Sequence, residues 1–164
     1  MKQKKQQDKG LFSKKHQFTT FEISDHLFGI NILDVKEIID EVTLTKIYHA
    51  PDEILGFVNI RGQVYLVLDL RVLLNFEKKN IDESSRVLIF TPKVGEFFGV
   101  MVDRIGHMEE VDERLIEYRQ LDEARTKSDK NYQKSDLEIG TCKLMNRLMI
   151  ILDAIKLLEA VDCS

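Results

Sequence analysis

The sequence contains no tryptophan, two prolines and two cysteines among its 164 residues. The two cysteines, Cys142 and Cys163, cannot build a multi-disulfide framework and lack the spacing of a zinc site, so we interpret them as reduced thiols. Uninterrupted apolar runs reach only about five residues, far short of the roughly 20 that a membrane-spanning helix needs. The basic N-terminus is not followed by an apolar segment, which argues against a secretory signal. We therefore expect a cytoplasmic protein.

Motifs that mark common catalytic and cofactor sites are missing as well. The eight glycines are scattered and form neither G-x-x-x-x-G-K-[ST] nor G-x-G-x-x-G, the two patterns that bind phosphate groups. The four histidines have no ligand spacing to one another or to the cysteines, so we predict no metal site and no cofactor. No nucleophile motif is apparent. We therefore expect a protein that is not an enzyme.

Charge is divided unevenly between the N-terminal tail and the rest of the chain. Residues 1–16 contain six lysines and one aspartate, and the remainder contains 18 basic and 27 acidic side chains, a net charge of −9. We predict that this basic tail is solvated and disordered. A tail of this kind could also bind a polyanion, so a small β-barrel that binds nucleic acid is the alternative function. The acidic body disfavours it, because phosphate contacts need a basic surface.

Short runs of apolar and β-branched residues alternate with turn residues, which indicates a mainly β protein. The predicted strands are 17–23, 27–32, 43–48, 54–60, 64–68, 86–90, 97–102, 139–145 and 147–152. The polar segment 76–84 is predicted to be a break between two halves, and 117–136 an exposed loop or frayed helix. Residues 153–161, "DAIKLLEAV", have helical spacing and predict a terminal helix that docks on the core.

One pattern occurs four times: a strand ends in aspartate, and a helical or irregular segment follows. The four aspartates are Asp34, Asp69, Asp103 and Asp153. Aspartate is a favourable helix N-cap, and Glu37 stands at the capping-box distance from Asp34. We therefore predict four caps rather than a metal or phosphoacceptor cluster, with a short helix after Asp34. The repeat also suggests two similar small barrels.

Four blocks, "FGINILDVKEII", "APDEILGFVNIRGQVYLVLDLRVLL", "FGVMVDRIGHMEEV" and "LMIILDAIKLL", resemble the CheW family of chemotaxis coupling proteins in order and spacing. The resemblance covers residues 17–161 and implies a single CheW-like domain, followed by a loose end at 162–164. It implies a mainly β fold of two SH3-like five-stranded β-barrel subdomains packed across an apolar seam, with short helices and a C-terminal helix. The sequence departs from the family at Tyr48 and Tyr65, where proline is common.

The resemblance also implies a function and two contact surfaces. The chain would be a non-enzymatic scaffold that couples chemoreceptors, the methyl-accepting chemotaxis proteins, to the histidine kinase CheA, and it would be recruited to membrane-associated receptor arrays. The CheW-like regulatory domain of the kinase would contact Val35, Glu37, Ile38 and Leu44. The helical tip of a receptor would lie in a groove near Gly56, Val87 and Met108.

An arginine stands at a predicted hairpin turn within an otherwise apolar stretch, residues 56–71. A cation beside an apolar surface needs a carboxylate partner. By the resemblance, Arg61 matches the arginine of an Asn-x-Arg-Gly motif, and Glu37 matches the glutamate of a Val-x-Glu-Ile motif. We predict that Arg61 and Glu37 form an ion pair that holds the predicted helix, with Val35 and Ile38, against the first barrel.

Overall fold

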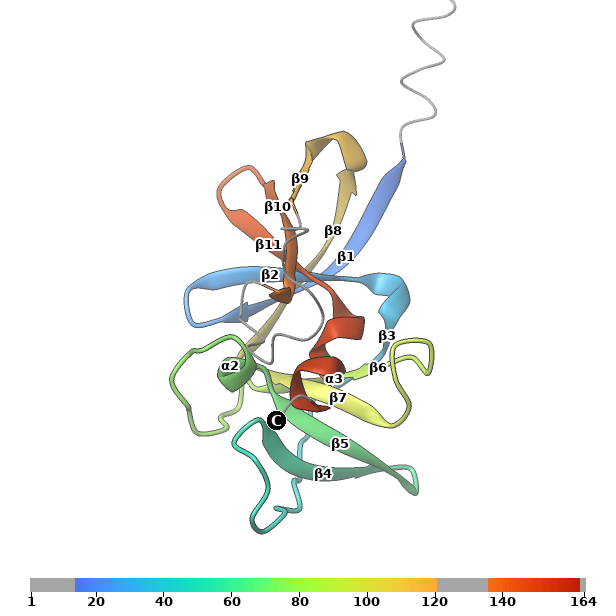
Figure 1. Cartoon of the computed structure of the whole chain (residues 1–164), viewed down its shortest axis with the longest axis vertical. Helices are drawn as coiled ribbons and strands as arrows, with labels where there is room; N and C mark the ends of the chain where they lie inside the picture. Colours follow the sequence, from blue (N-terminus) through green and yellow to red (C-terminus); the bar gives the residue numbers. More distant parts are fainter. Residues whose placement is uncertain (1–13, 121–135, 163–164) are drawn as a thin grey trace, which may run out of the picture.

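The computed structural model describes residues 14–120 and 136–162, which form two β-sheets and a few short helices (Figure 1). One sheet has six strands in the spatial order β8-β1-β2-β11-β10-β9, and we call it the first subdomain. Its strands are β1 (Lys15–Ile23), β2 (His26–Asn31), β8 (Arg104–Asp112), β9 (Ile116–Tyr118), β10 (Glu138–Lys143) and β11 (Leu148–Leu152).

The other sheet, the second subdomain, has five strands in the order β3-β6-β7-β5-β4. Its strands are β3 (Val35–Ile39), β4 (Ile54–Ile60), β5 (Gln63–Asp69), β6 (Arg86–Phe90) and β7 (Phe98–Val102). The short helices are the 3-10 turns η1 (Ile32–Asp34) and η2 (Glu113–Leu115) and the α-helices α2 (Leu70–Leu73) and α3 (Ala154–Asp162). In Figure 1, α3 lies between the two sheets.

The chain changes subdomain twice. It passes from the first sheet to the second through η1 and returns at Asp103, between β7 and β8. The first subdomain is therefore built from both ends of the described chain. The polar segment 76–84 was predicted to separate two halves, but it joins α2 to β6, and the strands before and after it belong to one sheet.

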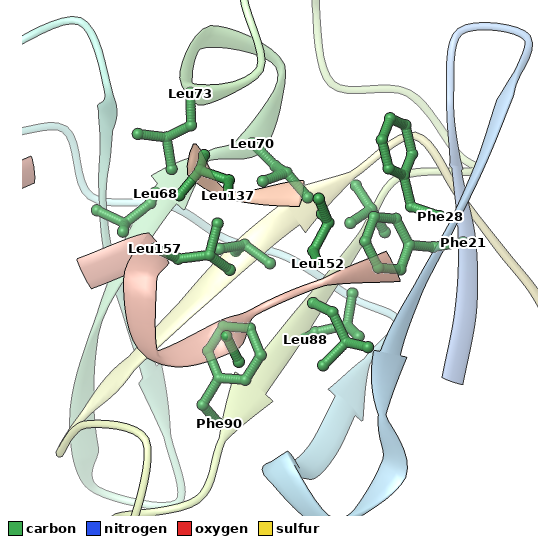
Figure 2. Packing of buried hydrophobic residues seen from close by; sticks show 14 of the residues in the cluster. Phe21, Phe28, Leu68, Leu70, Leu73, Leu88, Phe90, Leu137, Leu152 and Leu157 are labelled. Atoms are coloured by element: carbon green, nitrogen blue, oxygen red, sulfur yellow. The ribbon is translucent and has the colours of Figure 1, made fainter. Parts of the chain in front are cut away.

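The largest hydrophobic core lies between the two sheets rather than inside either of them. Side chains from both subdomains and from α3 meet there (Figure 2), among them Phe21, Phe28, Leu68, Leu88, Phe90 and Leu157. Each subdomain also buries an interior of its own; these include Phe18, Met149 and Ile151 in the first subdomain and Val58, Val67 and Met101 in the second. The predicted mainly β fold of two subdomains packed across an apolar seam is confirmed, although one sheet has six strands and not five.

Strand β6 explains why parts of the sequence are apolar at every position. Val87 and Ile89 point into the interior of the second subdomain, whereas Leu88 and Phe90 point into the seam. A strand that is buried on both faces reads as a continuous apolar run, not as an alternation of apolar and polar residues.

The predicted strands agree with the structure where the apolar signal is strong. The bounds of β4 and β6 are those predicted, but the strand expected at 43–48 does not form, and only a single bridge joins Thr45 to Phe57. Strands β8 and β9 were missed. Of the nine residues of β8 only Val111 is buried, so no apolar periodicity marks the strand.

The short helix expected after Asp34 is also wrong. Asp34 is the last residue of η1, and the next five residues form β3, an edge strand that pairs with β6. Val35, Ile38 and Ile39 are β-branched, which favours a strand over a helix. The apolar residues that gave the helical spacing face different sides of this strand.

Two of the four aspartates cap helices as predicted. The carboxylate of Asp69 accepts a hydrogen bond from the Arg71 backbone N–H at 3.0 Å, and that of Asp153 accepts one from the Ile155 N–H at 3.0 Å. Asp34 and Asp103 do not cap helices. Asp103 lies at the crossover between the subdomains and binds a side chain instead.

Asp103 and Arg71 form a largely buried ion pair, which also contacts Ser24 in the β1–β2 turn. The Arg71 guanidinium donates two hydrogen bonds to Asp103, at 2.8 and 2.7 Å, and one to Ser24 Oγ at 3.0 Å. The Ser24 N–H donates to Asp103 at 2.8 Å. Burial alone would raise the pKa of Asp103, but the bonds from Arg71 and Ser24 outweigh it and lower the pKa. The cluster therefore joins the first subdomain to the second at one edge of the seam.

Parts of three predictions fall outside the described residues: the basic tail, the charged loop and the loose C-terminus. The residues concerned are 1–13, 121–135 and 163–164. Within the described part, β1 already begins at Lys15, and β9 includes Glu117 and Tyr118. Strands β1 and β9 therefore include residues that were predicted to belong to the tail and the loop.

Candidate partner-binding surfaces

Arg61 and Glu37 are in contact. Arg61 stands in the β4–β5 turn with a positive φ of 49°, and Asn59 supports the turn by accepting a hydrogen bond from the Gly62 N–H at 2.9 Å. The guanidinium donates to the two carboxylate oxygens of Glu37 at 3.1 and 2.5 Å. Because β3 and β4 are opposite edges of the second sheet, this ion pair links the two edges of a curled sheet. It anchors a strand, not the helix that was expected.

The ion pair is largely open to solvent on the arginine side. The side chain of Arg61 is 73% exposed and that of Glu37 is 30% exposed. The hydrogen bond from Arg61 lowers the pKa of Glu37, and the same bond raises the pKa of Arg61. Water screens the attraction at such a site, so the pair positions β3 more than it stabilises the fold.

The other residues expected to contact a kinase do not form one patch. Val35 and Ile38 lie opposite Phe90 and Leu88 of β6, so they share the side of β3 that faces the seam. Leu44 packs instead against the interior of the second subdomain. Ile38 is 37% exposed, so it offers apolar surface on the edge strand.

The three residues expected near a receptor groove are also separated. Gly56 and Val87 belong to the second subdomain and are buried, Val87 completely. A Cβ at Gly56 would lie 2.3 Å from the carbonyl oxygen of Thr45, so this position requires glycine for the close approach of the chain. Met108 lies on β8 of the first subdomain and is 57% exposed. Of these three residues, only Met108 presents a side chain to solvent.

A cluster that the sequence did not reveal lies beside the ion pair. The Lys36 Nζ donates a hydrogen bond to the Tyr65 hydroxyl at 3.2 Å and lies 5.7 Å from the centre of the Tyr65 ring. The Tyr65 ring meets the Phe97 ring edge to face at 6.0 Å. Tyr65 was noticed in the sequence only as a departure from the family, and nothing near it in the sequence pointed to Lys36 or Phe97.

The first subdomain carries a cleft of about 750 Å³ between β8 and the β10–β11 hairpin. Apolar side chains, including Leu27 and Val111, line part of it. At its rim, Glu22 binds Arg104 at 2.8 Å and Arg147 at 2.5 Å, and the hydrogen bond from Arg147 contributes most to lowering the pKa of Glu22. These bonds hold the hairpin against β8, the strand that carries Met108.

The described residues, 14–120 and 136–162, contain neither a candidate metal site nor a candidate membrane span. No group of three or more histidine, cysteine, aspartate or glutamate side chains is placed to hold a metal ion in this part of the chain. Among the same residues, no helix is long and apolar enough to cross a membrane.

Comparison with known proteins identifies the family. The family model of the CheW-like domain matches residues 17–162. The chain therefore belongs to the CheW family. The chemotaxis protein CheW of Helicobacter pylori is 30% identical over 148 residues, which cover 87% of this chain and 81% of that protein. The chemotaxis protein CheW of Klebsiella aerogenes is 33% identical over 92 residues, 55% of this chain and 54% of that protein.

A solved structure supports the same conclusion. The crystal structure of the scaffolding protein TtCheW from Thermoanaerobacter tengcongensis matches with a TM-score of 0.71 and 27% sequence identity, over 85% of this chain and 90% of that one. The arrangement of two subdomains is therefore the CheW arrangement. The resemblance noted in the sequence is confirmed at the level of family and fold.

Proposed function

We propose that this chain is a non-enzymatic cytoplasmic scaffold that couples chemoreceptors to the CheA histidine kinase and is recruited to membrane-associated receptor arrays. Its membership of the CheW family carries the proposal. The division into two subdomains supports the proposal, because each could carry a surface of its own. A scaffold that holds two partners at once needs surfaces that do not overlap.

The kinase surface would be the exposed edge of β3 in the second subdomain. Ile38 is exposed there, and the Arg61–Glu37 pair ties the strand to the β4–β5 turn. Val35 would contribute through its position on the same side of β3, and Leu44 by supporting the segment that follows. An edge strand that pairs with β6 and is tied by an ion pair presents a fixed shape, which reduces the entropy lost on binding.

The receptor surface would centre on Met108 of the first subdomain. Methionine suits a surface that takes an apolar helix face, because its side chain adapts to varied partners. Gly56 and Val87 would act indirectly, since their burial places them in the packing of the second subdomain. We expect them to stabilise the second subdomain without touching the receptor.

A binding comparison tests the proposal. The purified chain should bind both the CheW-like regulatory domain of a CheA kinase and a receptor-tip fragment, and should not bind oligonucleotides at physiological salt. The net charge of −9 given by 18 basic and 27 acidic side chains after residue 16 disfavours the nucleic-acid alternative. Binding to oligonucleotides alone would reject the scaffold and support that alternative.

A further inference from the structure

Phe97 holds an exposed aromatic ring on a backbone that disfavours it. The residue is 49% exposed, and its φ is +55°, in the left-handed region. A bulky residue is rare there, whereas glycine and asparagine are tolerated. The Phe97 carbonyl accepts a hydrogen bond from the Leu66 N–H at 2.8 Å, and this bond does not depend on the side chain. The turn itself therefore gives no reason for phenylalanine, and strained positions of this kind are often functional.

Tyr65 joins the Phe97 ring to a cation, the ammonium of Lys36. This ammonium is held by the hydroxyl and the ring of Tyr65, and Tyr65 in turn contacts the Phe97 ring. Among the ion pairs of the described residues none includes Lys36, and the carboxylate of its neighbour Glu37 is bound by Arg61. A cation held over a ring is strengthened when a partner excludes water from it.

This cluster adjoins the surface proposed for the kinase. Lys36 precedes Glu37 on β3. The hydrogen bond from Arg61 is the main cause that lowers the pKa of Glu37, and the charge of Lys36 lowers it further. Residues 17–164 carry a net negative charge, so a lysine that contacts an aromatic ring and no carboxylate among the described residues stands out from this acidic surface. An aromatic anchor next to a positioned charge is the composition of many binding hot spots.

We infer that Lys36, positioned by Tyr65, and Phe97 form a specificity-determining contact for the kinase regulatory domain, one that takes an acidic side chain flanked by an apolar one. The inference rests on the proposed function and deepens it. Lys36 would pair with the partner's carboxylate, and the Phe97 ring would pack on the adjacent apolar group. The hydroxyl and ring of Tyr65 restrict the position of the ammonium before binding, which reduces the loss of side-chain entropy.

The test uses Phe97→Asn, which removes the ring but suits the positive φ, and Lys36→Gln. Isothermal titration with the regulatory domain of the CheA kinase from the same genome should show about a tenfold loss of affinity for Phe97→Asn, with an unchanged thermal midpoint. Lys36→Gln should weaken binding less and reduce its dependence on salt. Ile81→Asn is the matched control, because Ile81 is 47% exposed and lies in the loop between α2 and β6, beside Asp69 and Asp103, and it should bind normally.

The possible results separate the two proposals. Normal binding by both Phe97→Asn and Lys36→Gln would overturn this inference while leaving the scaffold function intact. If the unmodified chain does not bind the regulatory domain, the proposed function fails, and the inference fails with it. If Phe97→Asn lowers the thermal midpoint, Lys36→Gln decides, because this exposed substitution leaves the turn unchanged.

Discussion

At the scale of single residues, exposure separates two ion pairs that look alike in the sequence. Both pair an arginine with a carboxylate far away in the chain. The side chains of Arg71 and Asp103 are only 13% and 15% exposed, whereas that of Arg61 is 73% exposed. A buried pair leaves an uncompensated charge when one partner is removed, but an exposed charge is rehydrated. The two pairs should therefore respond differently to substitution.

For the exposed pair, we expect small losses of stability that are not additive. Arg61→Gln and Glu37→Gln should each lower the free energy of unfolding slightly, and the double variant should lose less than the sum of the two. Each single variant should also weaken kinase binding, because β3 loses its link to the β4–β5 turn. A double-mutant cycle by urea unfolding measures the coupling. Strictly additive losses would mean that Arg61 has another partner.

For the buried pair, we expect a large loss that depends on pH. Asp103→Ala should lower the free energy of unfolding at neutral pH by about 3 kcal/mol. Since the pKa of Asp103 is lowered in the folded protein, its stabilisation is complete above the unfolded value of about 4 and is lost as the pH falls through the folded pKa. The difference between the variant and the unmodified chain should shrink in acid.

Urea unfolding at several pH values measures this difference. Asp52→Ala is the control, because Asp52 pairs with Lys78 at 2.8 Å but both side chains are largely exposed. It should cost much less. A difference for Asp103→Ala that stays constant into acid would show that Asp103 does not stabilise the fold through its charge.

At the scale of elements, the sequence predicted the strands that are rich in apolar residues and missed those that are not. Strand β6 has a strong apolar signal because both of its faces are covered, and β4, although it is an edge strand, is also rich in apolar residues. β8 is mostly exposed, so its pairing with β1 decides its structure and its own residues do not. β3 was predicted as a helix because short apolar segments satisfy both periodicities. Pairing with β6, which is distant in sequence, decides between them.

The candidate sites follow the same division. The contact between Arg61 and Glu37 could be proposed from motif resemblance, because each residue lies in a recognisable block. The Lys36, Tyr65 and Phe97 cluster could not, because three separate elements bring it together. Gly56 and Val87 were expected to contact a receptor, but both are buried. No pattern in the sequence distinguishes such buried residues from exposed ones.

A single position tests how β4 is fitted to the segment before it. Gly56→Ala should lower the free energy of unfolding by about 2 kcal/mol, because φ is +148° and the new Cβ would meet the Thr45 carbonyl. Gly62→Ala is the matched control: its φ is also positive, at +84°, but a Cβ there meets nothing within 4 Å. Thermal unfolding should show a larger loss for Gly56→Ala. Equal losses would mean that backbone strain, and not the close approach, makes Gly56 necessary.

At the scale of the whole molecule, the seam makes two small subdomains behave as one body. Its core takes side chains from β1, β2, β5, β6, β7 and α3, so neither sheet can bury its apolar face alone. A large apolar seam restricts the relative motion of two subdomains. The surface at Met108 and the edge of β3 are therefore held at a fixed separation, which is what a coupling scaffold requires.

The most direct test of this account asks whether the two surfaces are independent. Calorimetry should measure the binding of Ile38→Asp and Met108→Glu to the CheA regulatory domain and to a receptor-tip fragment; Ile38 is used because it is exposed, whereas Val35 packs on the core. We predict that Ile38→Asp loses about tenfold or more in affinity for the kinase domain and binds the receptor normally, and that Met108→Glu shows the reverse. Circular dichroism should show that both variants remain folded. Loss of both partners by either folded variant would contradict two separate surfaces, and so would normal binding of both partners by both variants.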